Sequence, residues 1–316
     1  MMMNQQTIKQ EKTGYWISDV IVNLVLQVMM FFLVKFIADS FGLVTTIGFV
    51  GAYLLLLVIV QVGMTPYFNK NRPANLRREV NTALTNSSWF TVALVSLFVY
   101  ISISIRCVSL NFYFHDYVDQ QSLMAWLEVG LIHVGREDAF AAGVAVFIMF
   151  GVLVQIIGVL LLSLFISLYR KKDLFILCLL LTAFFTALFY IPAPDDINLI
   201  FLLFLLKSLV FAPTIPLLWA MISHDINLYD DFGFKQQATS FGFSGVAFTL
   251  KAGLALGAIF VCFMLLSYGY MPEAKNVHSW TVMQCLRWLS SIIPSIFMIV
   301  GAILFLANDN TKSEKI

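Results

Sequence analysis

Long runs of apolar residues, separated by short polar segments, extend along nearly the whole of this 316-residue sequence. A helix needs about 20 apolar residues to cross the hydrocarbon core of a membrane, and in such runs only helices satisfy the backbone. The pattern predicts eight membrane-spanning helices, at residues 15–38, 44–66, 89–114, 139–168, 174–191, 197–222, 238–268 and 281–306. The segment 120–134 is shorter and carries Glu128, so we expect an interfacial helix or a loop there.

The composition supports a membrane protein, with 60% hydrophobic residues, 12% charged residues and a mean hydropathy of +0.88. Soluble domains carry about 25% charged residues, so most of this surface is expected to face membrane lipid. The net charge is +1 and the basic residues lie in separate short loops, which argues against a nucleic-acid partner. The four cysteines lie far apart without metal-ligand spacing, as small core residues do.

Lysine and arginine are distributed unequally between alternate loops. With a cytoplasmic N-terminus, the cytoplasmic segments hold twelve basic residues, and the external loops hold only Arg136 and Lys275. The positive-inside rule therefore predicts that both termini are cytoplasmic, which an even number of spans requires. No cleavage site follows the polar N-terminus, so we expect the first span to remain as a signal anchor in a plasma membrane, the inner membrane of a bacterium.

Five charged residues fall within or at the edges of the predicted spans: Asp19, Lys35, Arg106, Lys207 and Lys251. Each costs about 2.5–3.5 kcal/mol at the bilayer centre on insertion scales, unless it is paired or hydrated. Lys35 lies near the outer end of the first span, where we expect its amine to reach the water. Lys207 lies in the middle of a span, and the sequence leaves open both a buried ion pair and a functional role.

Lys251 lies among small residues in the stretch FTLKAGLALG. Gly253 and Gly257 form a GxxxG pattern, which is typical of closely packed membrane helices. A lysine in such a stretch must meet a carboxylate, a carbonyl or cavity water. The sequence leaves open a functional role for Lys251 and a buried pair that only fixes the packing.

Helix breakers and aromatic residues mark other parts of the spans. Pro213, Pro216 and Pro294 predict bends, which are common in transporters and also occur in purely structural bundles. Four aromatic residues at the end of the third span could stack on a sugar ring or form an interfacial belt. They are Phe112, Tyr113, Phe114 and Tyr117.

No catalytic constellation is present in the sequence. His224 and Asp225 have no nucleophile beside them, and the four histidines share no metal-ligand spacing. We therefore predict that the protein is not an enzyme and binds no cofactor. The acidic residues of SHDINLYDDFGFK lie in a predicted cytoplasmic loop, and such a loop is usually solvated surface.

The stretch PTIPLLWAMISHDINLYDDFGFKQQATSFGFSGVAFTLKAGLALG carries a recognisable pattern, which runs without a gap from Leu217 to Gly257. It resembles the signature of the glycoside–pentoside–hexuronide:cation symporters, the melibiose-permease group of the major facilitator superfamily (MFS). GYWISDVIVNLVLQ resembles the first helix of that family, and IRCVSLNFYFHDYV resembles its seventh. YGYMPEA and SSIIPSIF resemble its last loop and helix.

The resemblance implies an all-α polytopic fold of two six-helix halves around a central sugar cavity, working by alternating access. This chain has eight predicted spans instead of twelve. Residues 1–66 resemble a truncated N-terminal half with helices one and six, and helices two to five are missing. Residues 67–88 resemble the central cytoplasmic loop, and residues 89–316 a complete C-terminal six-helix half.

The resemblance also implies roles for individual residues. Asp19 falls on the aspartate of helix one that binds sugar, and Lys251 on a lysine near the cavity and the cation site. Since the family places both residues near the solute site, we expect Lys251 to face the central cavity and to pair with Asp19. Arg106, Trp219 and Tyr113 complete the candidate set of sugar- or cation-binding residues.

A loop at the inner gate contributes a second group of candidates. Asp225 and Tyr229 match the aspartate and tyrosine of this gating loop, to which Asp231 also belongs. Leu228, Gln236 and Gln237 stand where the family has one acidic and two basic residues, which predicts a weaker gate.

The resemblance therefore predicts a sugar transporter, with a glycoside, pentose or hexuronide as substrate and Na⁺ or H⁺ as the coupling ion. The missing helices carry most of the family's cation-binding carboxylates. We expect weak or no sugar binding by the chain alone and no ion-driven accumulation. The alternative is a non-transporting remnant, or a half-carrier that needs a second copy or a complementary half.

Overall fold

The computed structural model describes residues 33–68, 87–130, 139–166, 168–228, 237–271 and 280–313. These residues are almost entirely helical, and no strand occurs among them. A helical segment at residues 33–41 precedes the helices α2 (Leu43–Phe68), α4 (Ser87–Phe112), η1 (a π-helix, Tyr113–Tyr117), α5 (Gln120–Val129), α6 (Ala139–Phe165), α7 (Lys171–Leu188), α8 (Ile197–Phe211), α9 (Thr214–Leu228), α10 (Gln237–Ser267), α11 (Trp280–Ser290) and α12 (Ile292–Ser313).

Five helical stretches of the described chain are long and apolar enough to cross a membrane. They are Phe90–Tyr117, Ala142–Leu162, Ile197–Met221, Gly245–Ser267 and Trp280–Ala307. Each coincides with a predicted span, and the predicted fold class, an all-α polytopic membrane protein, is confirmed. Helices α2 and α7 coincide with two further spans, and most of the first predicted span lies outside the described residues.

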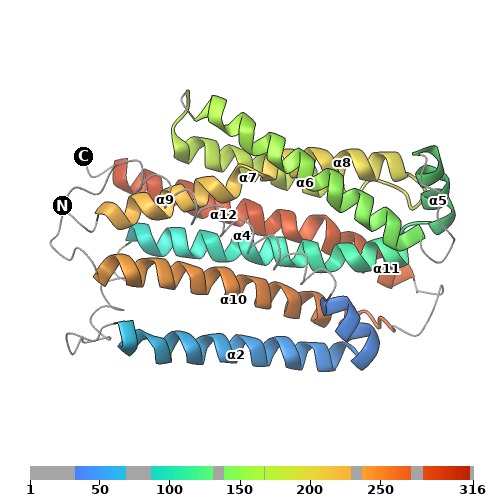
Figure 1. Ribbon diagram of the computed structural model, residues 1–316, viewed down its shortest axis with the longest axis horizontal. Helices are drawn as coiled ribbons and strands as arrows, with labels where there is room; N and C mark the ends of the chain where they lie inside the picture. Colours follow the sequence, from blue (N-terminus) through green and yellow to red (C-terminus); the bar gives the residue numbers. More distant parts are fainter. Residues whose placement is uncertain are drawn as a thin grey trace, which may run out of the picture.

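Helix α4 is the centre of the bundle. It packs against α10 on one side and α12 on the other, and α2 packs against the far side of α10 (Figure 1). Beyond α12 follow α7, α8 and α6. In the apolar stretch of α4, 67% of the residues are buried, against 28% in that of α6.

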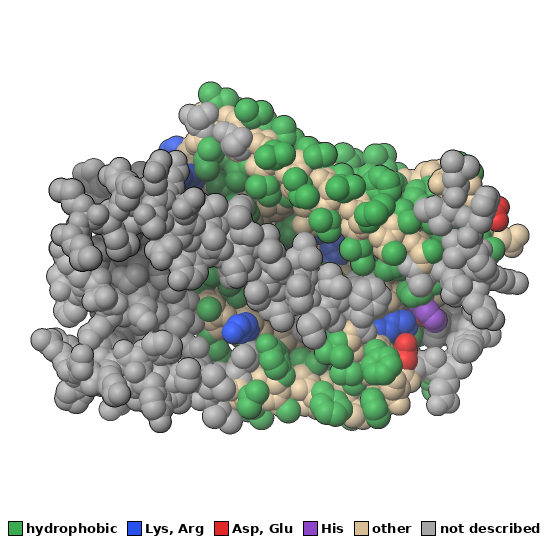
Figure 2. All heavy atoms as spheres, in the orientation of Figure 1, with side chains coloured by type: hydrophobic (Ala, Val, Ile, Leu, Met, Phe, Trp, Pro, Cys, Tyr) green, Lys and Arg blue, Asp and Glu red, His purple; other side chains and the backbone are tan. Residues whose placement is uncertain are grey.

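The outer face of α6 is apolar along its length. Exposed side chains recur every three or four residues at Met149, Leu153, Ile156, Leu160 and Leu164. This spacing places them on one face of the helix. Figure 2 shows apolar side chains over the described part of the molecular surface, as expected of a protein that contacts lipid.

The predicted GxxxG contact lies between α10 and α4. A Cβ atom on Gly253 would lie 2.9 Å from the Leu97 carbonyl oxygen, and one on Gly257 would lie 2.6 Å from the Ser104 Cβ. The hydroxyl of Ser104 donates a hydrogen bond to the Leu254 carbonyl of α10 at 2.5 Å. The close approach of two membrane helices at these glycines is therefore confirmed.

Two of the predicted bends are helix breaks. Helix α8 ends at Phe211 and α9 begins at Thr214, so the chain breaks at Pro213, and Pro216 lies in the first turn of α9, where proline is tolerated. A second break separates α11 from α12 at Ser291, three residues before Pro294.

Short turns and one short helix close the end of the bundle where α5 lies (Figure 1). Segment 120–134 contains α5, the interfacial helix expected there, whose first turn is capped by the Asp119 carboxylate accepting from the Ser122 backbone N–H at 2.8 Å. The indole of Trp126 donates to the Asn198 side chain at 2.9 Å. At Gly42 the backbone has φ +84°, which lets the chain reverse between segment 33–41 and α2.

The α4–α10 contact can be tested by adding one methyl group. Gly257→Ala should lower the melting temperature, because the new methyl would also lie 2.7 Å from the Ile101 carbonyl, and the two backbones would have to move apart. Such overpacking costs about 1–3 kcal/mol. The measurement is thermal unfolding in detergent, followed by circular dichroism.

The matched control is Gly301→Ala on α12, which also packs against α4. There the nearest atom to a new Cβ is 3.8 Å away, an ordinary contact, so alanine should stabilise its helix by up to about 1 kcal/mol. Equal effects at the two glycines would contradict the close approach at Gly257.

Candidate functional site

A cavity of about 120 Å³ lies inside the bundle, between α4, α6, α7, α8 and α12. Apolar side chains form much of its wall, including the rings of Phe204 and Phe211. Polar groups project from four of the helices: Ser102 and Arg106 from α4, Gln155 from α6, Thr186 from α7, and Lys207 and Ser208 from α8. None of the described residues that line the cavity is an aspartate or a glutamate.

Arg106 is the more deeply buried of the two cations, with 5% of its surface exposed. Its Nη1 donates to the Ser290 carbonyl at 2.5 Å, and its guanidinium lies 4.4 Å from the centre of the Phe189 ring. Its Nη2 is buried and has no hydrogen-bond partner among the described residues. Since guanidinium has five N–H donors, part of its capacity is left for another acceptor.

The Ser290 carbonyl is available because of Pro294. In an uninterrupted helix it would accept from the backbone N–H four residues later, but proline has none. Ser102, Arg106 and Ser109 share one face of α4, since they are spaced by four and three residues. They donate to the carbonyls of Pro294, Ser290 and Leu289 at 2.7, 2.5 and 3.0 Å. This polar stripe of α4 satisfies the carbonyls around the break and holds Arg106 in place.

Lys207 enters the cavity from α8. Its ammonium lies 4.5 Å from the centre of the Phe211 ring, one turn further along the helix. It has no hydrogen bond or ion pair with a described residue. The ion pair that the sequence left open for this residue is therefore not formed within the described part of the chain. Arg106 and Lys207 share one cavity as two like charges.

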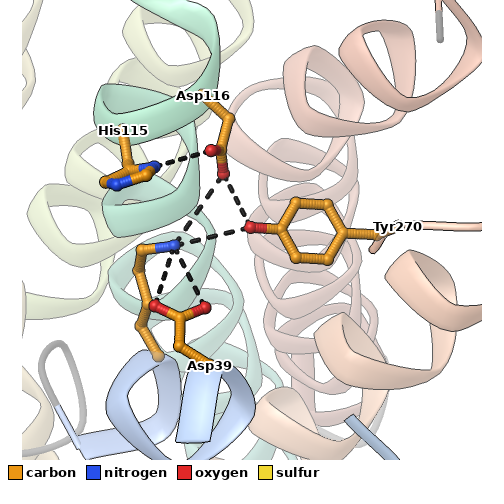
Figure 3. A network of polar contacts seen from close by, with 5 residues as sticks. Asp39, His115, Asp116 and Tyr270 are labelled. Atoms are coloured by element: carbon orange, nitrogen blue, oxygen red, sulfur yellow. Dashed lines mark hydrogen bonds and ion pairs between the residues drawn. The ribbon is translucent and has the colours of Figure 1, made fainter. Parts of the chain in front are cut away.

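A second polar cluster lies at the α5 end and joins segment 33–41, η1 and the residues after α10 (Figure 3). The Lys35 ammonium lies 3.3 Å from the Asp39 carboxylate and 3.9 Å from that of Asp116. The Asp116 carboxylate also accepts from the Tyr270 hydroxyl at 2.9 Å and contacts the His115 Nδ1 at 2.6 Å. Burial, and next the charge of Asp116, raise the pKa of the Tyr270 hydroxyl.

The expectation that the Lys35 amine reaches the water is wrong. Only 8% of its side chain is exposed, and the ammonium lies 4.4 Å from the centre of the Phe112 ring. Two carboxylates hold it inside the bundle: Asp39, one turn further along the same helix, and Asp116, which lies far away in the sequence. Sequence reasoning therefore missed Asp116 and Tyr270. Two local signals were present: Asp39, four residues after Lys35, and the acidic Asp116, two residues after the third predicted span.

The aromatic candidates lie outside the cavity. Tyr113 is fully buried and stacks on Tyr117 with ring centres 4.7 Å apart. Phe114 meets the ring of Phe147 edge to face at 4.7 Å. All four aromatic residues of the cluster are buried, so they form a packed core and not an exposed belt. Trp219 is half-buried and packs against the hydrophobic core between α4, α7 and α9.

The other predicted site residues are not brought together by the described structure. Lys251 is exposed on α10 and does not line the cavity. Asp19 lies outside the described residues, so its pairing with Lys251 stays a prediction. Asp225 lies in α9, which continues to Leu228, and the expectation of a loop at this residue is wrong. Tyr229 and Asp231 lie outside the described residues.

Comparisons with known proteins agree with this architecture. The model of a family described as "MFS/sugar transport protein" matches residues 11–307. YagG of Escherichia coli (strain K12), which is named as a glycoside/cation symporter, is 23% identical over 254 residues, covering 80% of this chain and 50% of YagG. The chain thus spans about half the length of the curated relative that it matches. The predicted resemblance is confirmed at the level of the family.

The buried cluster at the α5 end can be tested by removing its cation. Lys35→Met should destabilise the protein by about 3 kcal/mol, because Asp116 would then be a buried carboxylate without its ammonium partner. Thermal unfolding in detergent measures the change. The double variant Lys35→Met/Asp116→Asn should recover most of the loss, because the remaining carboxylate, Asp39, is exposed to solvent and no buried carboxylate is left without its partner.

The control is Lys171→Met, which removes the same charge from an exposed residue in the first turn of α7. It should leave the melting temperature almost unchanged. If Lys35→Met behaved like Lys171→Met, the ammonium of Lys35 would have to lie in solvent.

Proposed function

The chain belongs to the family of MFS/sugar transport proteins, and from this premise we propose that it takes part in carrying a sugar across a membrane together with a monovalent cation. The sugar is a glycoside, a pentose or a hexuronide, and the cation is Na⁺ or H⁺. The relative YagG, named as a glycoside/cation symporter, supports this class of substrate. The membrane is the plasma membrane, which is the inner membrane in a bacterium.

The observation that carries the proposal is the polar cavity within the membrane bundle. Ionisable and amide side chains are costly at membrane depth, and where they gather around a cavity they mark a solute path. Arg106, Gln155 and Lys207 present donors to this cavity from three helices, α4, α6 and α8. Convergent donors in a largely apolar pocket are the arrangement that fixes the hydroxyl groups of a small polar ligand.

Coupling to a cation needs more than these residues supply. Na⁺ is a hard cation and prefers oxygen ligands, as other hard cations do. The described cavity instead is lined by two positively charged side chains, Arg106 and Lys207, which would repel a cation. We propose that Asp19 and a second protein surface, either another copy or a complementary half, complete the cation site. Alternating access would then open and close the cluster around Lys35 and Asp116, which joins three segments at one end of the bundle.

The proposal predicts what the chain does by itself. In vesicles that contain only this polypeptide, we expect sugar binding no tighter than about millimolar and no accumulation driven by a Na⁺ or H⁺ gradient. Millimolar affinity corresponds to about 4 kcal/mol of binding free energy. Binding is measured by ligand-induced stabilisation with a panel of melibiose, xylose and a glucuronide.

Two results would contradict this proposal. Concentrative uptake by the single chain, abolished by Asp19→Asn, would show that no second surface is required. The absence of binding to any sugar of the panel, also in whole cells that contain the complementary proteins, would favour a non-transporting remnant.

The orientation in the membrane gives a separate prediction. The described turns at the α5 end contain no lysine or arginine, whereas Arg170, Lys171 and Lys172 lie together where α7 begins. We therefore propose that the α5 end is external. A cysteine at Met271, which is exposed after α10, should react with an impermeant maleimide in intact cells.

A cysteine at Lys171 should react only after lysis. The native cysteines Cys178, Cys262 and Cys285 are buried and Cys107 is half-buried, so their background labelling should be low. The reverse pattern at Met271 and Lys171 would invert the orientation.

A further inference from the structure

We propose that Arg106 and Lys207 form a binding subsite for the carboxylate of an acidic sugar, so that the transported substrate is an anion and not a neutral glycoside. This inference rests on the proposed function and narrows its substrate class. It starts from two side chains that the described structure places on one cavity without an acidic partner.

The charge of the cavity is the first argument. Arg106 and Lys207 both line it, and neither forms an ion pair with a described residue. Two like charges repel each other, so each raises the free energy of keeping the other charged. The apolar side chains around both cations offer little solvation in return. A carboxylate bound between them would neutralise part of this charge, whereas a neutral sugar would leave both cations unbalanced.

The geometry of Arg106 is the second argument. Its Nη1 is held by the Ser290 carbonyl and its plane packs on the Phe189 ring, so the guanidinium is fixed before any ligand arrives. The buried Nη2 keeps its donors unpaired among the described residues. The planar donors of a guanidinium match the geometry of carboxylate oxygens. The ammonium of Lys207 adds a compact positive charge, and its flexible side chain can follow the position of the bound carboxylate.

The remaining walls suit the body of one sugar. Gln155, Ser102 and Ser208 offer amide and hydroxyl groups for ring hydroxyls, and the side chain of Phe204 offers apolar surface for the C–H bonds. A single water needs roughly 10–15 Å³ of such space. The cavity of about 120 Å³ therefore has room for one sugar ring with its acidic group.

The experiment compares two ligands that differ at one carbon. Methyl β-D-glucuronide carries a carboxylate where methyl β-D-glucoside carries a hydroxymethyl group. Their affinities for the purified full chain in a neutral detergent are measured by calorimetry. We expect the glucuronide to bind at least tenfold more tightly than the glucoside.

Lys207→Met should lower the affinity for the glucuronide about tenfold or more and that for the glucoside by a clearly smaller factor, because the glucoside would lose a hydrogen-bond donor and the glucuronide an ion pair. The ligand-free variant should melt at the same temperature as the parent chain or higher, because an unpaired charge has left the interior. This stability reading shows that the variant is folded. Lys171→Met removes an exposed charge far from the cavity lining and should keep the full preference for the glucuronide.

Competition experiments test whether the cavity prefers a sugar carboxylate to other anions. Inorganic phosphate and chloride should displace the glucuronide only at concentrations far above its own dissociation constant. Nanodiscs with phosphatidylglycerol should give the same affinity as nanodiscs of phosphatidylcholine. If phosphate, chloride or the anionic lipid competed as well as the glucuronide, the cavity would be a general anion or lipid site, and the inference would be overturned.

The remaining outcomes distinguish the inference from the proposed function. Equal affinities for the two methyl glycosides would overturn the acidic-sugar inference and leave sugar transport in place. If neither glycoside bound, at concentrations up to the solubility limit, both the inference and sugar binding by this cavity would fail together.

Discussion

Pro294 removes one backbone donor from the last membrane helix, and the bundle is arranged around the carbonyl that this leaves free. A carbonyl in a membrane has no water to bond, so a side chain must supply the donor. The polar stripe of α4 supplies donors to this carbonyl and to its neighbours, at Ser290, Leu289 and Pro294. Because α4 also packs extensively against both α10 and α12, the same helix fixes the packing and satisfies the break.

The arginine of that stripe, Arg106, contacts both the helix break and the cavity. A serine at residue 106 could satisfy one carbonyl and nothing else, whereas arginine donates to Ser290 and still carries unused donors and a full charge. The charge could have been neutralised by a neighbouring carboxylate, as happens to Lys35 beside Asp39 and Asp116. Around Arg106 the bundle instead provides a cavity and a second cation, Lys207. Carboxylates of the described chain thus neutralise Lys35 but not Arg106 or Lys207, and this difference supports the binding role that we propose for the latter two.

The sequence predicts most of the fold, because its strongest signals are local. Apolar length places the spans, Pro213 marks the break between α8 and α9, and Gly253 with Gly257 marks the closest helix contact. The site is harder to predict. Arg106 and Lys207 are each visible as a charge in an apolar run, but their common cavity exists only once α4 and α8 are packed. The fate of Lys35 depends on Tyr270, 235 residues away, and no local pattern carries that information.

Lys35, Arg106 and Lys207 also differ in how completely the described chain satisfies them. Lys35 has two carboxylates, a tyrosine hydroxyl and an aromatic ring. Arg106 has one carbonyl and one ring, and Lys207 has only a ring. An unpaired buried charge lowers the stability of the folded protein. The incomplete pairing of Arg106 and Lys207 is therefore not explained by a role in folding alone. Arg106 and Lys207 share this deficit at one cavity, and in our proposal a ligand of opposite charge supplies the missing partner there.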